Sequence, residues 1–243
     1  MTHSDKYKPI AWTEQLVGRY WDYWQQFPET YFTYDYGMAL VDMFSKYLKN
    51  QDLILDYGAG RGFLTQALLS KKFNVTAVDF SPASVSSLAS AFTQIPCFGG
   101  AYNLEDLLMQ EKQFSVIMLI EVIEHLGDED LKKTFSIIRK LLKPNGLLII
   151  STPNNEDLKE RTIYCPCCNH TFHRWQHVQS WDCSSLAACL QSEGFKITKS
   201  WQITLKKRMR FRERMIQEIK RNFYRALGKH RKQPHLLAMA TPL

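Results

Sequence analysis

The sequence predicts an α/β protein built on a doubly wound, seven-stranded sheet that is mostly parallel, with an antiparallel last strand. Between residues 40 and 152, short apolar stretches alternate with helical stretches of about ten residues. The short stretches are apolar almost throughout, as expected for strands that helices cover on both faces. A chain of 243 residues accommodates one such domain with additions.

The individual elements follow from periodicity and from the residues at their ends. Helices are expected where apolar residues recur every three or four positions, and strands where apolar runs end at Gly, Asp or Pro. The expected strands cover residues 53–58, 74–80, 96–102, 114–122, 146–152, 196–205 and 235–242. The expected helices cover residues 40–48, 63–71, 82–92, 130–142 and 184–195.

The net charge of +7 is concentrated in one segment. Residues Lys206 to Lys232 contain twelve Lys or Arg against Glu213 and Glu218, so the rest of the chain is net acidic. Apolar residues recur within the segment at helical spacing, which predicts an amphipathic basic helix inserted before the last strand. Such a helix suits an anionic surface, either membrane headgroups or RNA, or an acidic partner; it equally suits docking on its own domain with a solvated basic face.

Targeting and cysteine signals favour a cytoplasmic protein. No apolar run reaches the roughly 18–20 residues of a membrane span, and the first residues lack the apolar segment of a signal peptide. Three of the six cysteines crowd together at Cys165, Cys167 and Cys168, which is unlike a secreted disulfide framework. Reduced thiols or thiolate metal ligands fit better.

A glycine-rich turn follows the expected strand at 53–58. "ILDYGAGRGFL" places Asp56, Gly58, Gly60 and Gly62 between that strand and a helix, where glycine lets the backbone turn tightly and approach a ligand. The spacing differs from the dinucleotide pattern G-x-G-x-x-G. Asp79 ends the next strand about twenty residues later, where a carboxylate can accept both hydroxyls of a ribose.

These motifs resemble the class I S-adenosylmethionine-dependent methyltransferases from about residue 40 to residue 195. "LILDYGAGRG", "VTAVDFSPASV", "FSVIMLIEVIEHL" and "LLKPNGLLIISTPN" stand in the order of that family's motifs. The resemblance implies a Rossmann-like fold that binds S-adenosylmethionine, with its methionine amine near Asp56 to Gly60, its ribose on Asp79 and its adenine near Phe80, Asn103 and Leu104. The full expected cofactor set is Asp56, Tyr57, Gly58, Ala59, Gly60, Gly62, Asp79, Phe80, Asn103, Leu104 and Glu121.

"EVIEH" brings Glu121, Glu124 and His125 to the end of the fourth strand. Two carboxylates there are explained by charge complementarity to a sulfonium cation alone. The stretch also resembles E-x-x-E-H of the ubiquinone-pathway O-methyltransferases and of the enzymes that 2′-O-methylate small-RNA 3′ ends. In both, a later histidine in H-x-x-x-W completes a divalent-metal site, for which His177, four residues before Trp181, is the candidate. Glu124 and His125 are then the expected catalytic residues, and His125 is alternatively a general base.

A second metal hypothesis concerns residues 164–177. Cys165, Cys168, His173 and His177 have the spacing C-x2-C-x4-H-x3-H, which suits tetrahedral zinc. Cys167 and His170 are spare ligands in the same loop. His177 cannot close this site and also join Glu121, Glu124 and His125. Either His170 replaces it on the zinc, or zinc takes His177 and "EVIEH" carries no metal.

The expected organisation has four parts. Residues 1–38 carry ten aromatic side chains from Trp12 to Tyr36 and form a helical lid broken at Pro28, either packed on the sheet or stacked on a planar acceptor. Residues 39–205 form the methyltransferase domain with the Cys/His loop at 164–177, residues 206–232 the basic helix, and residues 233–243 the last strand. Three functions follow: O-methylation of a small-molecule or glycan hydroxyl, RNA 2′-O-methylation, or a non-catalytic scaffold stabilised by zinc.

Overall fold

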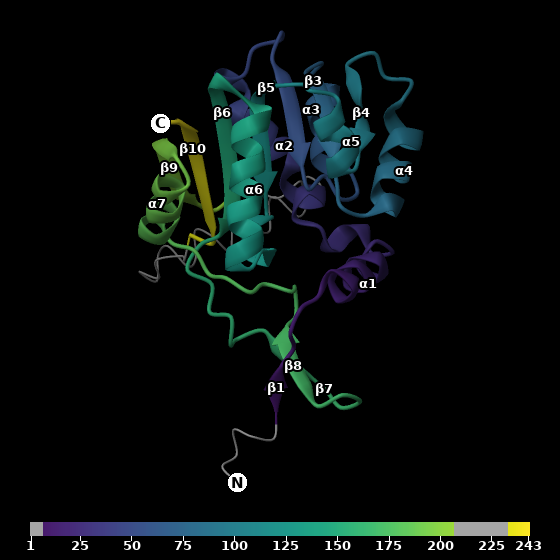
Figure 1. Cartoon of the computed structure of the whole chain (residues 1–243), viewed down its shortest axis with the longest axis vertical. Coiled ribbons are helices and arrows are strands. Elements are labelled where there is room, and N and C mark those ends of the chain that lie inside the picture. Colours follow the sequence, from purple (N-terminus) through teal and green to yellow (C-terminus); the bar gives the residue numbers. More distant parts are fainter. Residues whose placement is uncertain (1–6, 207–232) are drawn as a thin grey trace, which may run out of the picture.

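The computed structural model describes residues 7–206 and 233–243. Its centre is a seven-stranded sheet with the strand order β4-β3-β2-β5-β6-β10-β9 (Figure 1). The strands are β2 (Leu53–Tyr57), β3 (Asn74–Val78), β4 (Phe98–Tyr102), β5 (Phe114–Ile120), β6 (Leu142–Pro153), β9 (Phe195–Ile203) and β10 (His235–Pro242). The first five pair in parallel, and β10 is antiparallel to both β6 and β9. The predicted fold class is confirmed.

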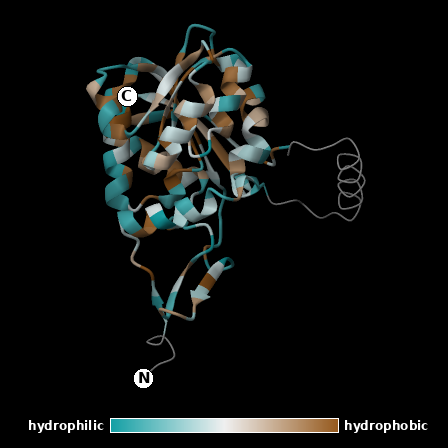
Figure 2. Cartoon of the chain, turned by 90° about the vertical axis from the view of Figure 1, so that its right-hand side faces the viewer, coloured by the Kyte–Doolittle hydropathy of each residue, from teal (hydrophilic) through white to brown (hydrophobic). Residues whose placement is uncertain are grey.

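Helices cover both faces of this sheet. On one face lie α2 (Phe32–Phe44), α3 (Phe63–Ser70) and α4 (Pro82–Phe92), and on the other α5 (Leu104–Met109), α6 (Asp128–Leu141) and α7 (Cys183–Ser192). Successive side chains of a strand point to opposite faces, so Met118 joins the first cluster while Ile117 and Leu119 join the second. All three are fully buried, and the ribbon in the interior of the domain is coloured largely as hydrophobic (Figure 2).

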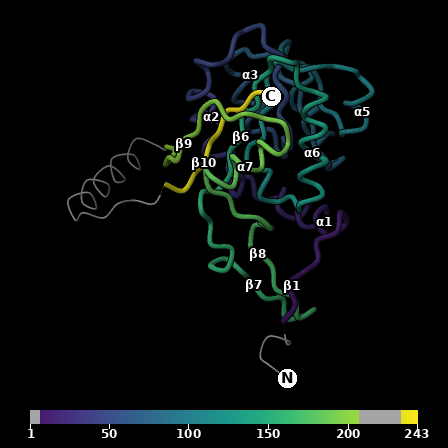
Figure 3. Tube along the Cα trace, turned by 60° about the vertical axis from the view of Figure 1, so that its left-hand side comes forward, coloured from purple at the N-terminus to yellow at the C-terminus, as the bar shows by residue number. Residues whose placement is uncertain are grey.

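A second, small sheet lies beyond the carboxyl ends of the parallel strands. β7 (Thr162–Cys165) and β8 (His170–His173) form an antiparallel hairpin, and β1 (Lys8–Pro9) pairs in parallel with β8 (Figures 1 and 3). The Cys/His stretch expected as a loop is therefore mostly a hairpin. A two-residue strand such as β1 has no periodicity to read, and only its partner β8 defines it.

The N-terminal helices depart from their expected boundaries. α1 (Glu14–Trp24) begins where the Thr13 hydroxyl accepts the N–H of Leu16, and the short 3-10 helix η2 (Pro28–Thr30) marks the break expected at Pro28. The helix expected over 40–48 starts earlier, because α2 begins at Phe32 and continues through residue 38 to Phe44, followed by η3 (Ser45–Tyr47). α5 was not among the expected helices.

Two further expectations concern the basic helix and the absence of a membrane span. Residues 207–232 of the expected basic helix lie outside the described residues. Within the described part of the chain, no helix is both long and apolar enough to cross a membrane.

Candidate functional site

A cavity of about 1520 Å³ opens at the carboxyl ends of β2, β3, β5 and β6. This is the edge at which open α/β sheets bind ligands. Every residue of the expected cofactor set lines it except Gly62, and Glu124, His125 and His177 line it too. Cys165, Cys168 and His173 do not.

The glycine-rich turn holds a backbone that only glycine adopts easily. Gly58, Gly60 and Gly62 have φ of +78°, +52° and +77°. A Cβ on Gly58 would lie 2.8 Å from Val122 Cγ2, and one on Gly62 would lie 2.4 Å from a side-chain carbon of Leu88. Gly58 and Gly60 thus present bare backbone to the cavity, whereas Gly62 allows α3 to begin close against α4.

Asp56 fixes the start of this turn. Its buried carboxylate accepts the hydroxyl of Thr65 on α3 at 2.6 Å, and burial raises the pKa of Asp56 to about 7. Next to it, the N–H groups of Gly58 and Ala59 both donate to the carbonyl of Val78. Tyr57 is half-buried between these anchors, and burial raises the pKa of its phenol.

Asp79 links the turn to the next strand. One carboxylate oxygen accepts the N–H of Gly60 at 2.8 Å and the other the N–H of Ser81 at 2.9 Å. Burial raises its pKa. The neighbouring Phe80 leaves 57% of its surface exposed at the cavity, which suits a ring that stacks on a planar group. Both positions agree with the ribose and adenine contacts that the motif resemblance implies.

Asn103 and Leu104 begin α5 beside the cavity. The Asn103 side chain accepts the N–H of Asp106 at 2.8 Å and donates to the Asp106 carboxylate at 2.8 Å. It therefore caps the helix, a role that the sequence did not indicate.

Glu121 follows β5 with a φ of +54°, the left-handed region that non-glycine residues rarely adopt. Its carboxylate accepts the hydroxyl of Ser151 at 2.7 Å, and its N–H donates to the carbonyl of Ser151 at 3.0 Å. Burial raises the pKa of Glu121 to about 7. The strained backbone turns the chain sharply from β5 into the 3-10 helix η4 (Ile123–His125), which aims Glu124 and His125 into the cavity.

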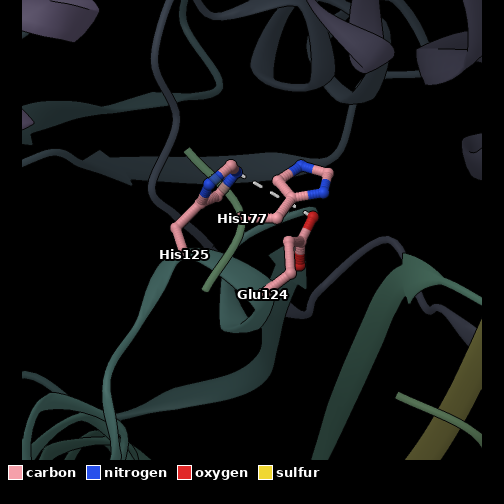
Figure 4. Close-up of side chains that lie close together, drawn as sticks. All are labelled: Glu124, His125 and His177. Carbon is pink, nitrogen blue, oxygen red and sulfur yellow. Dashed lines mark ion pairs between the residues drawn. The ribbon is translucent and has the colours of Figure 1, made fainter. Parts of the chain in front are cut away.

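Glu124, His125 and His177 come together as a three-residue cluster (Figure 4). Their ligand atoms all lie within 4.8 Å of one another, and Glu124 Oε1 is 3.9 Å from His125 Nε2. Glu124 is 1% exposed; Oε2 accepts the hydroxyl of Thr152 at 3.0 Å, while Oε1 has no hydrogen-bond partner among the described residues. Glu121, the other carboxylate expected here, stands outside the cluster.

The electrostatics of the cluster follow from its burial. Burial and the neighbouring Glu121 raise the pKa of Glu124 well above its ordinary value. Burial lowers the pKa of His125 to about 3. Two imidazoles and a buried carboxyl, one of whose oxygens has no hydrogen-bond partner among the described residues, form a donor set that fits a divalent metal ion of borderline softness.

A carboxylate that the sequence reasoning missed lies behind His177. Glu156 accepts a hydrogen bond from His177 Nδ1, and its other oxygen is 3.7 Å from His173 Nε2. Burial acts to raise the pKa of Glu156, but the hydrogen bond and the charges of the two histidines outweigh it, so this pKa is lowered. The sequence could have identified Glu156 by its position just after β6, at the same sheet edge as Asp79 and Glu121.

The structure does not assemble the four-ligand zinc set. β8 is extended and pairs Cys165 with His170 at the tip of the hairpin and Thr162 with His173 at its base. Three residues of strand span about 10 Å, so Cys165 and Cys168 lie at the end of the hairpin away from His173 and His177. Among the described residues, the two groups of three or more possible metal ligands contain no cysteine. His177 belongs with Glu124 and His125.

The N-terminal helix α1 contacts this cluster directly. Trp21 of α1 donates its indole N–H to Gln176 Oε1 at 3.1 Å, and Gln176 Nε2 donates to the carbonyl of His125 at 3.1 Å. The Trp21 ring also lies edge-on to the His125 ring, with centroids 5.1 Å apart. Trp21 and Gln176 are further residues of the site that the sequence did not single out.

Comparison with known proteins agrees with this geometry. Residues 23–200 match the family model described as "Methyltransferase domain". A ubiquinone biosynthesis O-methyltransferase of Rickettsia akari is 36% identical over 104 residues, which cover 42% of this chain and 40% of that protein. A probable S-adenosylmethionine-dependent methyltransferase of Mycolicibacterium smegmatis is 24% identical over 144 residues, which cover 59% of this chain and 52% of that protein. The alignments thus span about half or less of these relatives.

Two solved structures share the fold. A Burkholderia thailandensis 1,6-didemethyltoxoflavin-N1-methyltransferase, bound to 1,6-didemethyltoxoflavin and S-adenosylhomocysteine, superposes with a TM-score of 0.62 at 17% identity, covering 96% of this chain and 92% of its own. The glycopeptide N-methyltransferase MtfA with sinefungin gives a TM-score of 0.59 at 14% identity, covering 86% and 94%.

Proposed function

The chain belongs to the methyltransferase domain family, and we propose that it transfers the methyl group of S-adenosylmethionine to a hydroxyl oxygen of a small-molecule or glycan acceptor, assisted by a divalent metal ion. One observation supports the metal-assisted part: the buried Glu124 Oε1, close to His125 and His177, has no hydrogen-bond partner in the part of the chain that the structure describes. A buried carboxylate oxygen normally has a partner, and a cation supplies one.

The residues around the glycine-rich turn fit the cofactor. Gly58 and Gly60 offer backbone without side chains, Asp79 offers a carboxylate at the strand end, and Phe80 offers an exposed ring. The bound cofactor supplies an electrophilic methyl group on a sulfonium. Carboxylates on one rim of its site, Asp79 and Glu121 among them, complement that positive charge.

The cluster of Glu124, His125 and His177 would then bind and activate the acceptor. Glu124, His125 and His177 would hold the metal, whose positive charge favours ionisation of an acceptor hydroxyl. The Gln176 carbonyl lies 3.4 Å from His125 Nδ1 and accepts a hydrogen bond from it, so Nε2 of His125 is the free ring nitrogen. In the absence of the metal, His125 Nε2 is the group placed to accept the hydroxyl proton, but its pKa of about 3 makes it a weak base.

The wall of the cavity favours a neutral or cationic acceptor. Among the described residues that line it, thirteen are Asp or Glu, one is Arg and none is Lys. Such a wall repels phosphates, so it argues against RNA as the acceptor, the alternative that rests on the basic segment at 206–232. Aromatic side chains of Trp21, Tyr31 and Trp175 line the same cavity and suit a ring-bearing acceptor.

Metal removal tests the proposed reaction. We expect purified protein to methylate a catechol-type diol with isotope-labelled S-adenosylmethionine, to lose most of that activity after exhaustive chelation, and to regain it with Mn²⁺ or Zn²⁺. A monohydroxy analogue should react more slowly because it offers one oxygen. Full activity after chelation, with the metal content verified as nil, would remove metal assistance and leave His125 as the base.

We further propose that Cys165 and Cys168 hold a soft metal ion at the hairpin tip, without His173 and His177. The backbone N–H groups of Cys168 and Cys167 donate to Cys165 and, with the Cys168 side chain, lower the pKa of its thiol. Thiolates select zinc-type ions. Elemental analysis should find zinc in the wild type and in the control Cys183→Ser. The double variant with Cys165→Ser and Cys168→Ser should contain none. Zinc-free wild-type protein would refute this second site.

A further inference from the structure

The second cluster of metal-type residues, Glu156, His173 and His177, shares His177 with the catalytic cluster. We propose that Glu156 and His173 bind no metal themselves but act as positioning residues, which hold His177 in one tautomer, with its proton on Nδ1 and the lone pair of Nε2 free. This inference rests on the proposed function of that cluster and deepens it.

The hydrogen bonds of His173 define its own protonation. Its Nδ1 lies 3.2 Å from the backbone nitrogen of His177 and 3.4 Å from that of Trp175, and both N–H groups donate to it. A ring nitrogen that accepts hydrogen bonds carries no proton, so the proton of His173 lies on Nε2. Both ring nitrogens are therefore engaged or protonated, and no lone pair remains for a metal.

His173 in turn orients the Glu156 carboxylate. The Nε2 atom of His173 is buried, has no hydrogen-bond partner within normal distance among the described residues, and lies 3.7 Å from Glu156 Oε1. The Glu156 backbone is held separately, because Ser180 donates its hydroxyl to the Glu156 carbonyl at 2.7 Å. The carboxylate thus faces the two histidines from a fixed main chain.

Glu156 then determines the tautomer of His177. As a carboxylate it can only accept a hydrogen bond, so His177 Nδ1, which faces it, must carry a proton. The His173 and His177 rings also stack, with centroids 4.6 Å apart and planes 28° apart, which limits rotation of His177. Its remaining nitrogen, Nε2, is left as a lone pair for the cluster. Carboxylate partners of this kind commonly fix and strengthen metal-binding histidines.

The tautomers can be read directly in metal-free protein. Long-range ¹H–¹⁵N correlation of histidine-labelled protein at neutral pH should show the Nδ1–H form for His177 and the Nε2–H form for His173. In Glu156→Ala, His177 should lose its single tautomer. Glu156→Gln should retain it in part, because the amide oxygen still accepts one hydrogen bond. The control is Glu160→Ala, which removes an exposed carboxylate from the same cavity wall.

Metal and cofactor affinities separate positioning from a general structural role. Glu156→Ala should weaken Mn²⁺ binding by about ten- to hundredfold, with Glu156→Gln intermediate, while affinity for S-adenosylhomocysteine stays unchanged. An Nε2–H tautomer of His177 in the wild type, or Mn²⁺ affinity unchanged in Glu156→Ala, would overturn the proposal. If the wild type binds no Mn²⁺ at all, the metal-assisted reaction fails while the tautomers still decide the role of Glu156.

Discussion

Replacing Glu124 with Gln should reduce turnover by about a hundredfold or more. Even the loss of a residue that only hydrogen-bonds to a metal ligand lowers metal affinity or activity by about ten- to hundredfold. Gln keeps the shape of Glu124 and can still accept the Thr152 hydroxyl through one oxygen, but it puts an amide NH₂ or a neutral oxygen where the cluster needs a carboxylate. The measurement is single-turnover methyl transfer at saturating metal, with S-adenosylhomocysteine affinity measured alongside.

The Glu124→Gln substitution should not destabilise the fold. Glu124 is buried, and burial raises its pKa and so favours its uncharged form, which means that an uncharged isostere suits the metal-free protein. Its unfolding temperature should be unchanged or higher. The matched control is Asp130→Asn, an exposed carboxyl of the same cavity. Wild-type turnover in Glu124→Gln would contradict metal ligation by Glu124.

Asp79→Ala should raise the dissociation constant for S-adenosylhomocysteine by about ten- to hundredfold. Each hydrogen bond from a cofactor hydroxyl to this carboxylate is worth about 1.5–3 kcal/mol, and about 1.4 kcal/mol corresponds to a factor of ten. The change also deprives the N–H groups of Gly60 and Ser81 of their acceptor, which loosens the turn. Calorimetric titration measures both affinity and heat.

The control for Asp79 is Glu105→Ala, which removes an exposed carboxylate from the same cavity and should leave affinity within about twofold of the wild type. Equal losses in both variants would mean that the general negative charge of the cavity, and not a contact of Asp79, attracts the cofactor.

The central sheet was predictable because each strand carries its own signal. The apolar run at 235–242 predicts the last strand, and β10 occupies His235–Pro242. Asp79 could be placed for the same reason, since a carboxylate after a buried strand must emerge at the ligand-binding edge. These inferences need only local pattern and the rule that parallel strands share one edge.

The other half of the site depends on pairings that no local pattern reveals. C-x2-C-x4-H treats residues 165–173 as a compact loop, whereas pairing with β7 makes 170–173 an extended strand that carries His173 away from the cysteines. Glu156 becomes a partner of His177 only because the hairpin between them returns the chain to the end of β6. The left-handed backbone of Glu121 is likewise set by its bonds to Ser151.

The expected cofactor contacts and the residues near the hairpin of β7 and β8 come from different parts of the chain. The expected cofactor contacts lie between Asp56 and Glu121, whereas Glu156 and His177 flank the hairpin and Trp21 reaches them from the N-terminal helix. If the proposed function holds, we expect exchange of residues 156–177 together with α1 between relatives to change which acceptor is methylated while the cofactor site stays intact. The pairing of β1 with β8 ties the segment before α1 to the hairpin, so the two parts would have to be exchanged together.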